Sequence, residues 1–125
     1  MMSEVPKIFE SEYRFLLIVW KHEPVSSTEL VHLCEEEFQW KKSTTYTMIK
    51  KLTEKGVIKS KKAIVTSIVS KDEIQQSESM EFVKKTFGGS LPQFIAAFIS
   101  GKGLSKNEAH EIQELINQYK EHDYD

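Results

Sequence analysis

Positive charge is concentrated in one short part of the sequence, residues 41–62. This stretch contains eight lysines and one acidic residue, Glu54, a net charge of +7, although the whole chain has 17 basic and 19 acidic residues. The other residues therefore carry a net charge of −9, from nine basic and 18 acidic side chains. Ammonium groups at this density favour an anionic partner such as the phosphate backbone of nucleic acid. The lysines are Lys41, Lys42, Lys50, Lys51, Lys55, Lys59, Lys61 and Lys62.

The spacing of apolar residues predicts a helix at about 43–55 within this stretch. Its buried face is expected to consist of Thr45, Met48, Ile49 and Leu52, which recur at helical spacing. Lys55 in the last turn suits the helix dipole, and Gly56 is expected to end the helix. The opposite face is left with hydroxyl and ammonium groups and almost no carboxylate.

That polar face contains candidates for two kinds of contact with a DNA duplex. Contacts to base edges in the major groove select the sequence, whereas contacts to phosphate fix the position of the protein. The candidates for base edges are Ser43, Tyr46, Thr47 and Lys50. The candidates for phosphate are Lys41, Lys42 and Lys51, and Thr44 is expected either to cap the helix or to hold a phosphate.

Two short strands are predicted after this helix, at 57–60 and 63–69. β-branched residues dominate both segments, which favours strand over helix. The hairpin that they form carries Lys59, Lys61 and Lys62, which are expected to lie near a second stretch of DNA backbone. Helices followed by a basic hairpin are typical of a winged helix.

Two helices are predicted upstream. The first, at about 9–21, begins at Glu10 or Ser11 and presents an apolar face of Tyr13, Leu16, Leu17 and Trp20. The second begins with Ser26 as N-cap and Glu29 three residues later, the spacing of a capping box. Only a few residues join this second helix to the lysine-rich one, as expected of a helix-turn-helix unit.

The sequence after residue 70 predicts a second domain made of helices. We expect a mainly α fold, with a winged helix-turn-helix domain and its small β-hairpin wing at 8–70 and a helical dimerisation domain at 71–122. The segment 91–99 is strongly apolar and needs a surface to cover it, either a second copy of the chain or the N-terminal domain; a two-fold dimer is the preferred interpretation. The expected dimerisation residues are Phe82, Phe87, Leu91, Phe94, Ile95, Phe98, Ile99, Ile112, Leu115 and Ile116.

Several other classes of function are disfavoured. The lone cysteine, Cys34, is expected to be a buried thiol in a reducing cytoplasm rather than a metal ligand with His32, and His110 with Glu114 is expected to be a solvated pair. No metal, cofactor or enzymatic activity is predicted, because no paired carboxylates, phosphate loop or catalytic triad spacing is found. No membrane insertion and no secretory signal are expected.

Taken in order, several motifs resemble those of the BlaI/MecI/CopY, or penicillinase repressor, family of bacterial winged-helix regulators. The resemblance covers roughly residues 8–120 and rests on the order and spacing of its parts. These parts are the first helix ending at Trp20, the Ser26-Ser27-Thr28-Glu29 entry, the Trp40…Thr44…Thr47…Ile49…Leu52…Lys55-Gly56 run, the Val69-Ser70-Lys71-Asp72-Glu73 junction, the Phe87-Gly88-Gly89-Ser90 break and the Leu104-Ser105…Glu108 helix start.

The resemblance implies a dimeric repressor that reads a palindromic operator with the helix at 43–55. In the family's antibiotic-responsive branch, such operators control antibiotic-response genes. In the drug-responsive branch, a membrane sensor or protease acts upstream and the repressor is cleaved after an asparagine that precedes phenylalanine. The matching position here is Ala97-Phe98, which lacks that asparagine. The cysteine cluster of the copper-responsive branch is absent, and Lys41-Lys42 and Tyr46 depart from the usual residues, so an operator sequence does not carry over.

A second interpretation of the same residues is a protein–protein adaptor. Winged helices also serve as interaction modules, and a lysine-rich face can dock on an acidic protein. The two interpretations differ in one cheap measurement, because an adaptor should retain little random duplex on a filter at low salt.

Overall fold

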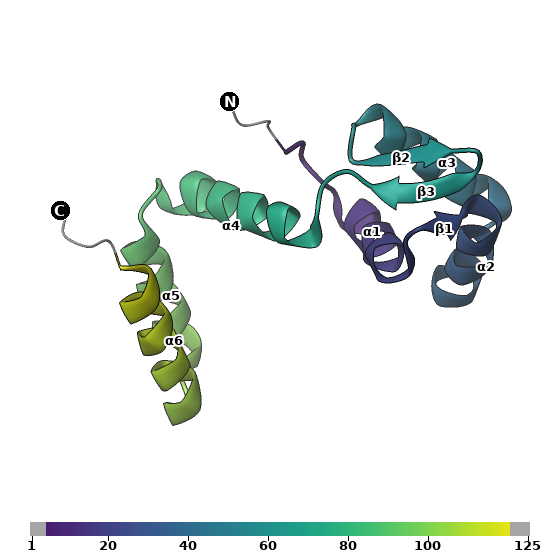
Figure 1. The fold of residues 1–125 in the computed structure, drawn as a ribbon. Coiled ribbons are helices and arrows are strands. Elements are labelled where there is room, and N and C mark those ends of the chain that lie inside the picture. The colour runs from purple at the N-terminus through teal and green to yellow at the C-terminus, as the bar shows by residue number, and fades with distance from the viewer. Residues whose placement is uncertain (1–4, 121–125) are drawn as a thin grey trace. The chain divides into compact units, whose positions relative to one another are not determined.

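The computed structural model describes residues 5–120 (Figure 1), which form a mainly helical chain with a small antiparallel sheet. The mainly α winged-helix fold expected from the sequence is confirmed. The elements in chain order are α1 (Glu10–His22), β1 (Val25–Ser26), α2 (Ser27–Phe38), α3 (Lys42–Glu54), β2 (Ile58–Lys61), β3 (Ile64–Ser67), α4 (Lys71–Phe87), α5 (Leu91–Lys102) and α6 (Lys106–Tyr119).

The sheet has the strand order β1-β3-β2, and both pairings are antiparallel. The hairpin of β2 and β3 places Lys61 opposite Ile64, and Lys62 and Ala63 form its two-residue turn with φ values of 54° and 65°. Positive φ at both central positions is the geometry of the common hairpin turns, which usually contain glycine. The predicted hairpin is therefore present, although its sequence has no glycine at the turn. Strand β1, which pairs Val25 with Val65, was not predicted because two residues leave no alternating pattern.

The core of the winged helix lies where α1, α2 and α3 pack with the sheet (Figure 1). The largest fully buried apolar side chains come from each of these elements and from the first turn of α4. They are Phe15, Leu16, Leu30, Leu52, Ile58 and Ile74. These residues hold α3 by one face, so its opposite face stays free.

The buried face of α1 differs from the face predicted from its apolar residues. Glu12, Phe15, Leu16 and Val19 are fully buried, whereas Leu17 remains 38% exposed. The predicted face was wrong by part of a turn because α1 is apolar almost all round, so that apolar spacing alone selects no single face. A charged residue, Glu12, occupies a core position instead.

Several helix caps match the sequence signals. Ser26 accepts a hydrogen bond from the backbone amide of Glu29, and Ser105 and Glu108 form a complete capping box. Helix α5 continues through Gly101 to Lys102. The helix stops at Gly103, whose φ is 80°.

The chain divides into two compact units, one up to Glu81 and the other from Phe82. The first turn of α4 belongs to the first unit, because Ile74 is fully buried in the core of the winged helix. The domain division expected at residue 70 stays a prediction.

The second unit contains a chain of aromatic contacts. Phe94 lies within 5.8 Å of Phe82, 5.5 Å of Phe87 and 6.3 Å of Phe98, measured between ring centroids. Phe87 and Phe94 are half-buried, and the other expected dimerisation residues are exposed in the single chain. The exposed ones are Phe82, Leu91, Ile95, Phe98, Ile99, Ile112, Leu115 and Ile116.

Candidate nucleic-acid interface

Helix α3 packs against the core with the buried face that its sequence predicts. Thr45, Met48, Ile49 and Leu52 are the buried residues of this helix. The other side of the helix must then face outwards, and every residue predicted to contact DNA is exposed. On α3 and at its start these are Lys41, Lys42, Ser43, Thr44, Tyr46, Thr47, Lys50 and Lys51; on the hairpin they are Lys59, Lys61 and Lys62.

The start of α3 has no side-chain cap. The N-cap residue is Lys41, whose backbone carbonyl accepts a hydrogen bond from the amide of Thr44 at 2.9 Å. The expectation that Thr44 caps the helix is therefore wrong, because the helix begins two residues earlier, at Lys42. Thr44 lies exposed in the first turn, where amide groups and the helix dipole favour an anion.

A hollow of about 230 Å³ lies along the outer side of α3. It is lined by Ser43, Thr44, Thr47, Met48 and Lys51. Three hydroxyls and an ammonium group are hydrogen-bond donors suited to phosphate oxygens, while the Met48 thioether offers an apolar contact. The hollow therefore brings together residues that the sequence assigned to base edges and residues that it assigned to phosphate.

A buried carboxylate, Glu12, lies beneath the C-terminal half of α3. Its Oε1 accepts hydrogen bonds from the Lys55 ammonium at 2.7 Å and from the Phe9 backbone amide at 2.9 Å. Its Oε2 lies 3.4 Å from the ammonium of Lys51. Burial raises the pKa of Glu12, but the contacts from Lys55, Phe9 and Lys51 outweigh it, so that this pKa is below its usual value.

This ion-pair cluster was missed in the sequence. The signal was present, since Glu12 lies one turn before Phe15 and Leu16 on the same helix face. A carboxylate at a core position needs a cationic partner, and the lysine-rich helix is the obvious source. Two of the lysines counted as free positive charge are therefore partly neutralised inside the protein.

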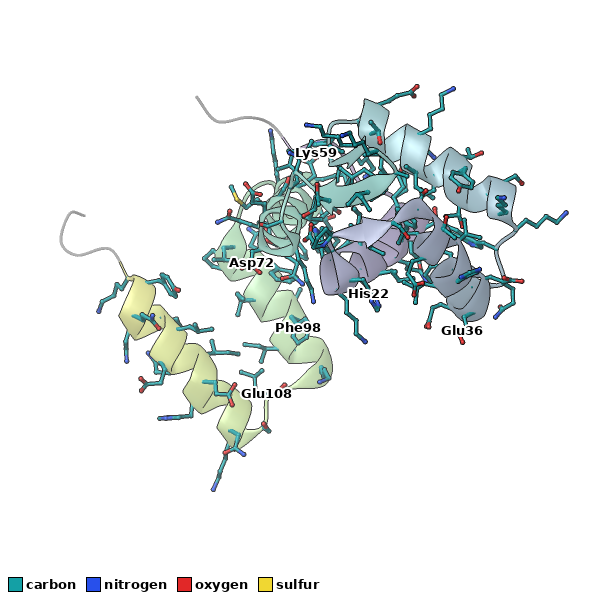
Figure 2. The ribbon with its side chains drawn as sticks, turned by 45° about the vertical axis from the view of Figure 1, so that its right-hand side comes forward. His22, Glu36, Lys59, Asp72, Phe98 and Glu108 are labelled. Carbon is teal, nitrogen blue, oxygen red and sulfur yellow. The ribbon has the colours of Figure 1, made fainter. Side chains whose placement is uncertain are left out.

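The hairpin adds further cations. Lys59, labelled in Figure 2, lies on β2 beyond the buried Ile58, and Lys61 and Lys62 follow at the end of the hairpin. Within residues 5–120, none of these three lysines forms an ion pair. Their ammonium groups are available to an external anion.

The cysteine and histidine residues form no metal centre in the described chain. Cys34 is fully buried, and burial raises the pKa of its thiol, although the neighbouring Thr45 hydroxyl partly offsets this. Among residues 5–120, no group of three His, Cys, Asp or Glu side chains is placed to hold a metal ion. His110 and Glu114 are 4.0 Å apart on α6, both well exposed.

A family model described as penicillinase repressor matches residues 8–118. The chain belongs to this family. It is a family of transcriptional repressors, so the chain is a DNA-binding repressor and not an enzyme, as the sequence predicted. No helix in the described part of the chain has both the length and the apolar character needed to span a membrane.

Relatives within the penicillinase repressor family cover nearly the whole chain. The penicillinase repressor of Bacillus licheniformis is 22% identical over 95% of this chain and 96% of that protein. The methicillin resistance regulatory protein MecI of Staphylococcus aureus (strain Mu50 / ATCC 700699) is 25% identical over 94% of this chain and 99% of that protein.

A solved structure matches a little over half of the chain. It is the solution structure of the monomeric form of Bacillus licheniformis BlaI in complex with the blaP half-operator. The match covers 58% of this chain and 93% of that chain, with 21% sequence identity and a TM-score of 0.50. This likeness shows that the chain contains the winged-helix fold of that BlaI structure.

Proposed function

We propose that a homodimer of this chain represses transcription by binding a palindromic operator, with α3 of each protomer in a major groove. The observation that carries this proposal is the outward face of α3, where hydroxyl and lysine side chains are exposed opposite a fully packed stripe. The solution structure of monomeric BlaI in complex with the blaP half-operator supports it, because a protein with the same fold binds half of an operator there.

The residues of the interface divide into two groups. Ser43, Tyr46, Thr47 and Lys50 are the groups that would contact base edges, since they lie on the face of α3 turned furthest from the core. The hairpin lysines and the lysines at the start of α3 would contact phosphate and fix the register of the helix in the groove. Lys51 would contact phosphate from the hollow while its ammonium stays near Glu12.

The dimer would form through the second unit. Helices α5 and α6 carry exposed apolar side chains. In the single chain, Phe98 (labelled in Figure 2) is 51% exposed and Leu115 is 53% exposed. Apolar groups at this exposure favour association, and a two-fold dimer is the commonest closed arrangement. Two-fold symmetry in the protein would match an inverted repeat in the DNA.

Selection of bound duplexes from a random pool tests the operator part of the proposal. The wild-type chain is expected to enrich an inverted repeat, and its affinity for that repeat should fall steeply with salt. If a dimer neutralises about eight phosphates, the slope of log K against log salt is about −7. A slope near zero, or enrichment of no repeat, would rule out the proposed interface.

The dimer would act in the cytoplasm, where its DNA lies, and an upstream membrane sensor or protease would control its release. The candidate bond for an inducing cleavage joins Ala97 and Phe98. Both side chains are exposed within α5, and the Ala97 carbonyl accepts a hydrogen bond from the Ser100 hydroxyl at 3.2 Å. A protease needs an extended segment, so cleavage at this bond would require α5 to open locally.

A further inference from the structure

The junction between the winged helix and α4 is held more firmly than a simple connection requires. The indole N–H of Trp20, on α1, donates a hydrogen bond of 3.0 Å to the carbonyl of Val69, 49 residues later in the chain. Val69 is also held by its own amide, which donates to the Val57 carbonyl at 3.2 Å. The last residue before Ser70 and α4 is therefore fixed both to α1 and to Val57, the residue that precedes β2.

The first turn of α4 is fixed as well. Ile74 is fully buried in the core, and the amide side chain of Gln75 donates to the Tyr13 hydroxyl at 3.3 Å. The Tyr13 ring in turn contacts the Trp20 ring edge-on, with 5.8 Å between the ring centroids. Ser70 and Glu73 close the start of the helix with a reciprocal capping box. We call Tyr13, Trp20, Val69 and Gln75 the α4 anchor.

After the anchor, α4 has little further contact with the winged helix. Between residues 75 and 81, Ser77 is the one half-buried side chain and the others are exposed. The helix contains no glycine or proline, the usual causes of a kink. Its direction as it leaves the winged helix is therefore decided by its first turn and by the contacts of the anchor.

We propose that Trp20 is a positioning residue that sets which half-site spacing a dimer accepts, by fixing the direction in which α4 leaves the winged helix. This inference rests on the proposed function. The 11 residues of α4 that belong to the first unit, 71–81, span about 16 Å at about 1.5 Å per residue. A change of about 10° at its first turn moves the end of this segment by about 3 Å, close to the rise of one base pair, about 3.4 Å.

The test compares spacing preference with affinity for a single half-site. The probes are the inverted repeat selected by the wild-type chain, the same repeat with one or two base pairs inserted or removed at its centre, and a duplex with one half-site. Trp20→Phe removes the indole N–H and keeps an aromatic ring. The affinity of this variant for the single half-site is expected to be within about twofold of the wild-type affinity. The ratio between its affinities for the preferred spacing and for the altered spacings should fall by about fivefold, the factor to which one neutral hydrogen bond corresponds.

Two further variants make the result specific. Trp40→Phe is the matched control, because Trp40 is also a half-buried indole at the edge of the core but contacts Phe15 and Phe38 instead of α4. Its spacing profile, normalised to its own half-site affinity, should equal that of wild type. Gln75→Ala alters an exposed member of the anchor without threatening the core, and should flatten the profile in the same direction.

The outcomes separate this inference from the function on which it rests. A wild-type spacing profile in both Trp20→Phe and Gln75→Ala would overturn the positioning role. An equal loss of affinity for the half-site and for every spacing would also overturn it, since that pattern indicates general destabilisation. If the wild-type chain itself prefers no inverted repeat, the proposed function fails first and the inference fails with it.

Discussion

Replacing Glu12 by glutamine removes the negative charge beneath α3 while keeping the size of the side chain. In the wild-type protein this carboxylate is fully buried and lies 2.7 Å from the Lys55 ammonium and 3.4 Å from that of Lys51. Glutamine can still accept the hydrogen bond from the Phe9 amide through its carbonyl oxygen. The substitution therefore isolates the contribution of the ion pairs from that of packing.

The expected loss of folding stability depends on how exposed each lysine side chain is to water. Breaking a fully buried ion pair by removing one partner costs about 3–5 kcal/mol. The Lys51 side chain is 51% exposed and can turn to solvent, whereas Lys55 is only 23% exposed. Lys55 also keeps the Lys7 carbonyl at 2.9 Å and the face of the Phe9 ring. We therefore expect Glu12→Gln to lower the free energy of unfolding by about 1–3 kcal/mol at pH 7.

The pH dependence of stability distinguishes an ion-pair effect from a packing effect. Because Lys55, Phe9 and Lys51 hold the pKa of Glu12 below its usual value despite burial, ionised Glu12 stabilises the folded state above the unfolded pKa of about 4.3. That contribution is lost as the pH falls through the lower folded pKa. The difference between wild type and Glu12→Gln should therefore shrink below about pH 4.

Urea unfolding followed by tryptophan fluorescence measures the free energy of unfolding at pH 7 and its change with pH. Glu10→Gln is the matched control, because Glu10 is an exposed carboxylate in the same helical turn, and it should change stability by less than about 0.5 kcal/mol. A Glu12→Gln protein as stable as wild type at pH 7, or a difference that persists unchanged in acid, would refute the role assigned to the ion pairs.

Three other predictions test separate parts of the structure. Tyr46→Ala should change which bases are enriched from a random pool, whereas Lys42→Ala should weaken binding to all sequences and make the salt slope shallower by about one for each phosphate that is no longer neutralised. Cys34 should react with a thiol reagent only after unfolding, because it is fully buried and its pKa is raised. Ile116→Glu should convert a dimer to a monomer in analytical ultracentrifugation, while Glu111→Gln on the same helix should not.

The sequence was sufficient to predict those features that depend on residues a few positions apart in the chain. The stripe of α3 follows from four residues at helical spacing, and the structure buries all four. The caps at Ser26 and Ser105 join a hydroxyl to the backbone amide three residues later, so a short window contains the whole interaction. The exposure of the predicted DNA-contacting residues follows from that stripe, because residues opposite a buried face point outwards.

The sequence was insufficient where the partner is distant. Strand β1 exists because Val25 and Ser26 pair with β3, about 40 residues later, and two residues have no pattern of their own. The face of α1 that is buried was decided by the residues packed around the helix, since an almost uniformly apolar helix can bury any of several faces. The bond from Trp20 to Val69 likewise joins residues that no short window contains.

Glu12 changes how the positive charge of α3 should be counted. The net charge of +7 over residues 41–62 treats every lysine as available to DNA, yet Lys51 and Lys55 share a carboxylate inside the protein. The other six lysines of that stretch form no ion pair within residues 5–120. Two protomers then offer about twelve such lysines, more than the eight or so phosphates assumed for the salt slope. The electrostatic basis of DNA binding therefore does not depend on Lys51, and Lys42 is the cleaner site at which to test it.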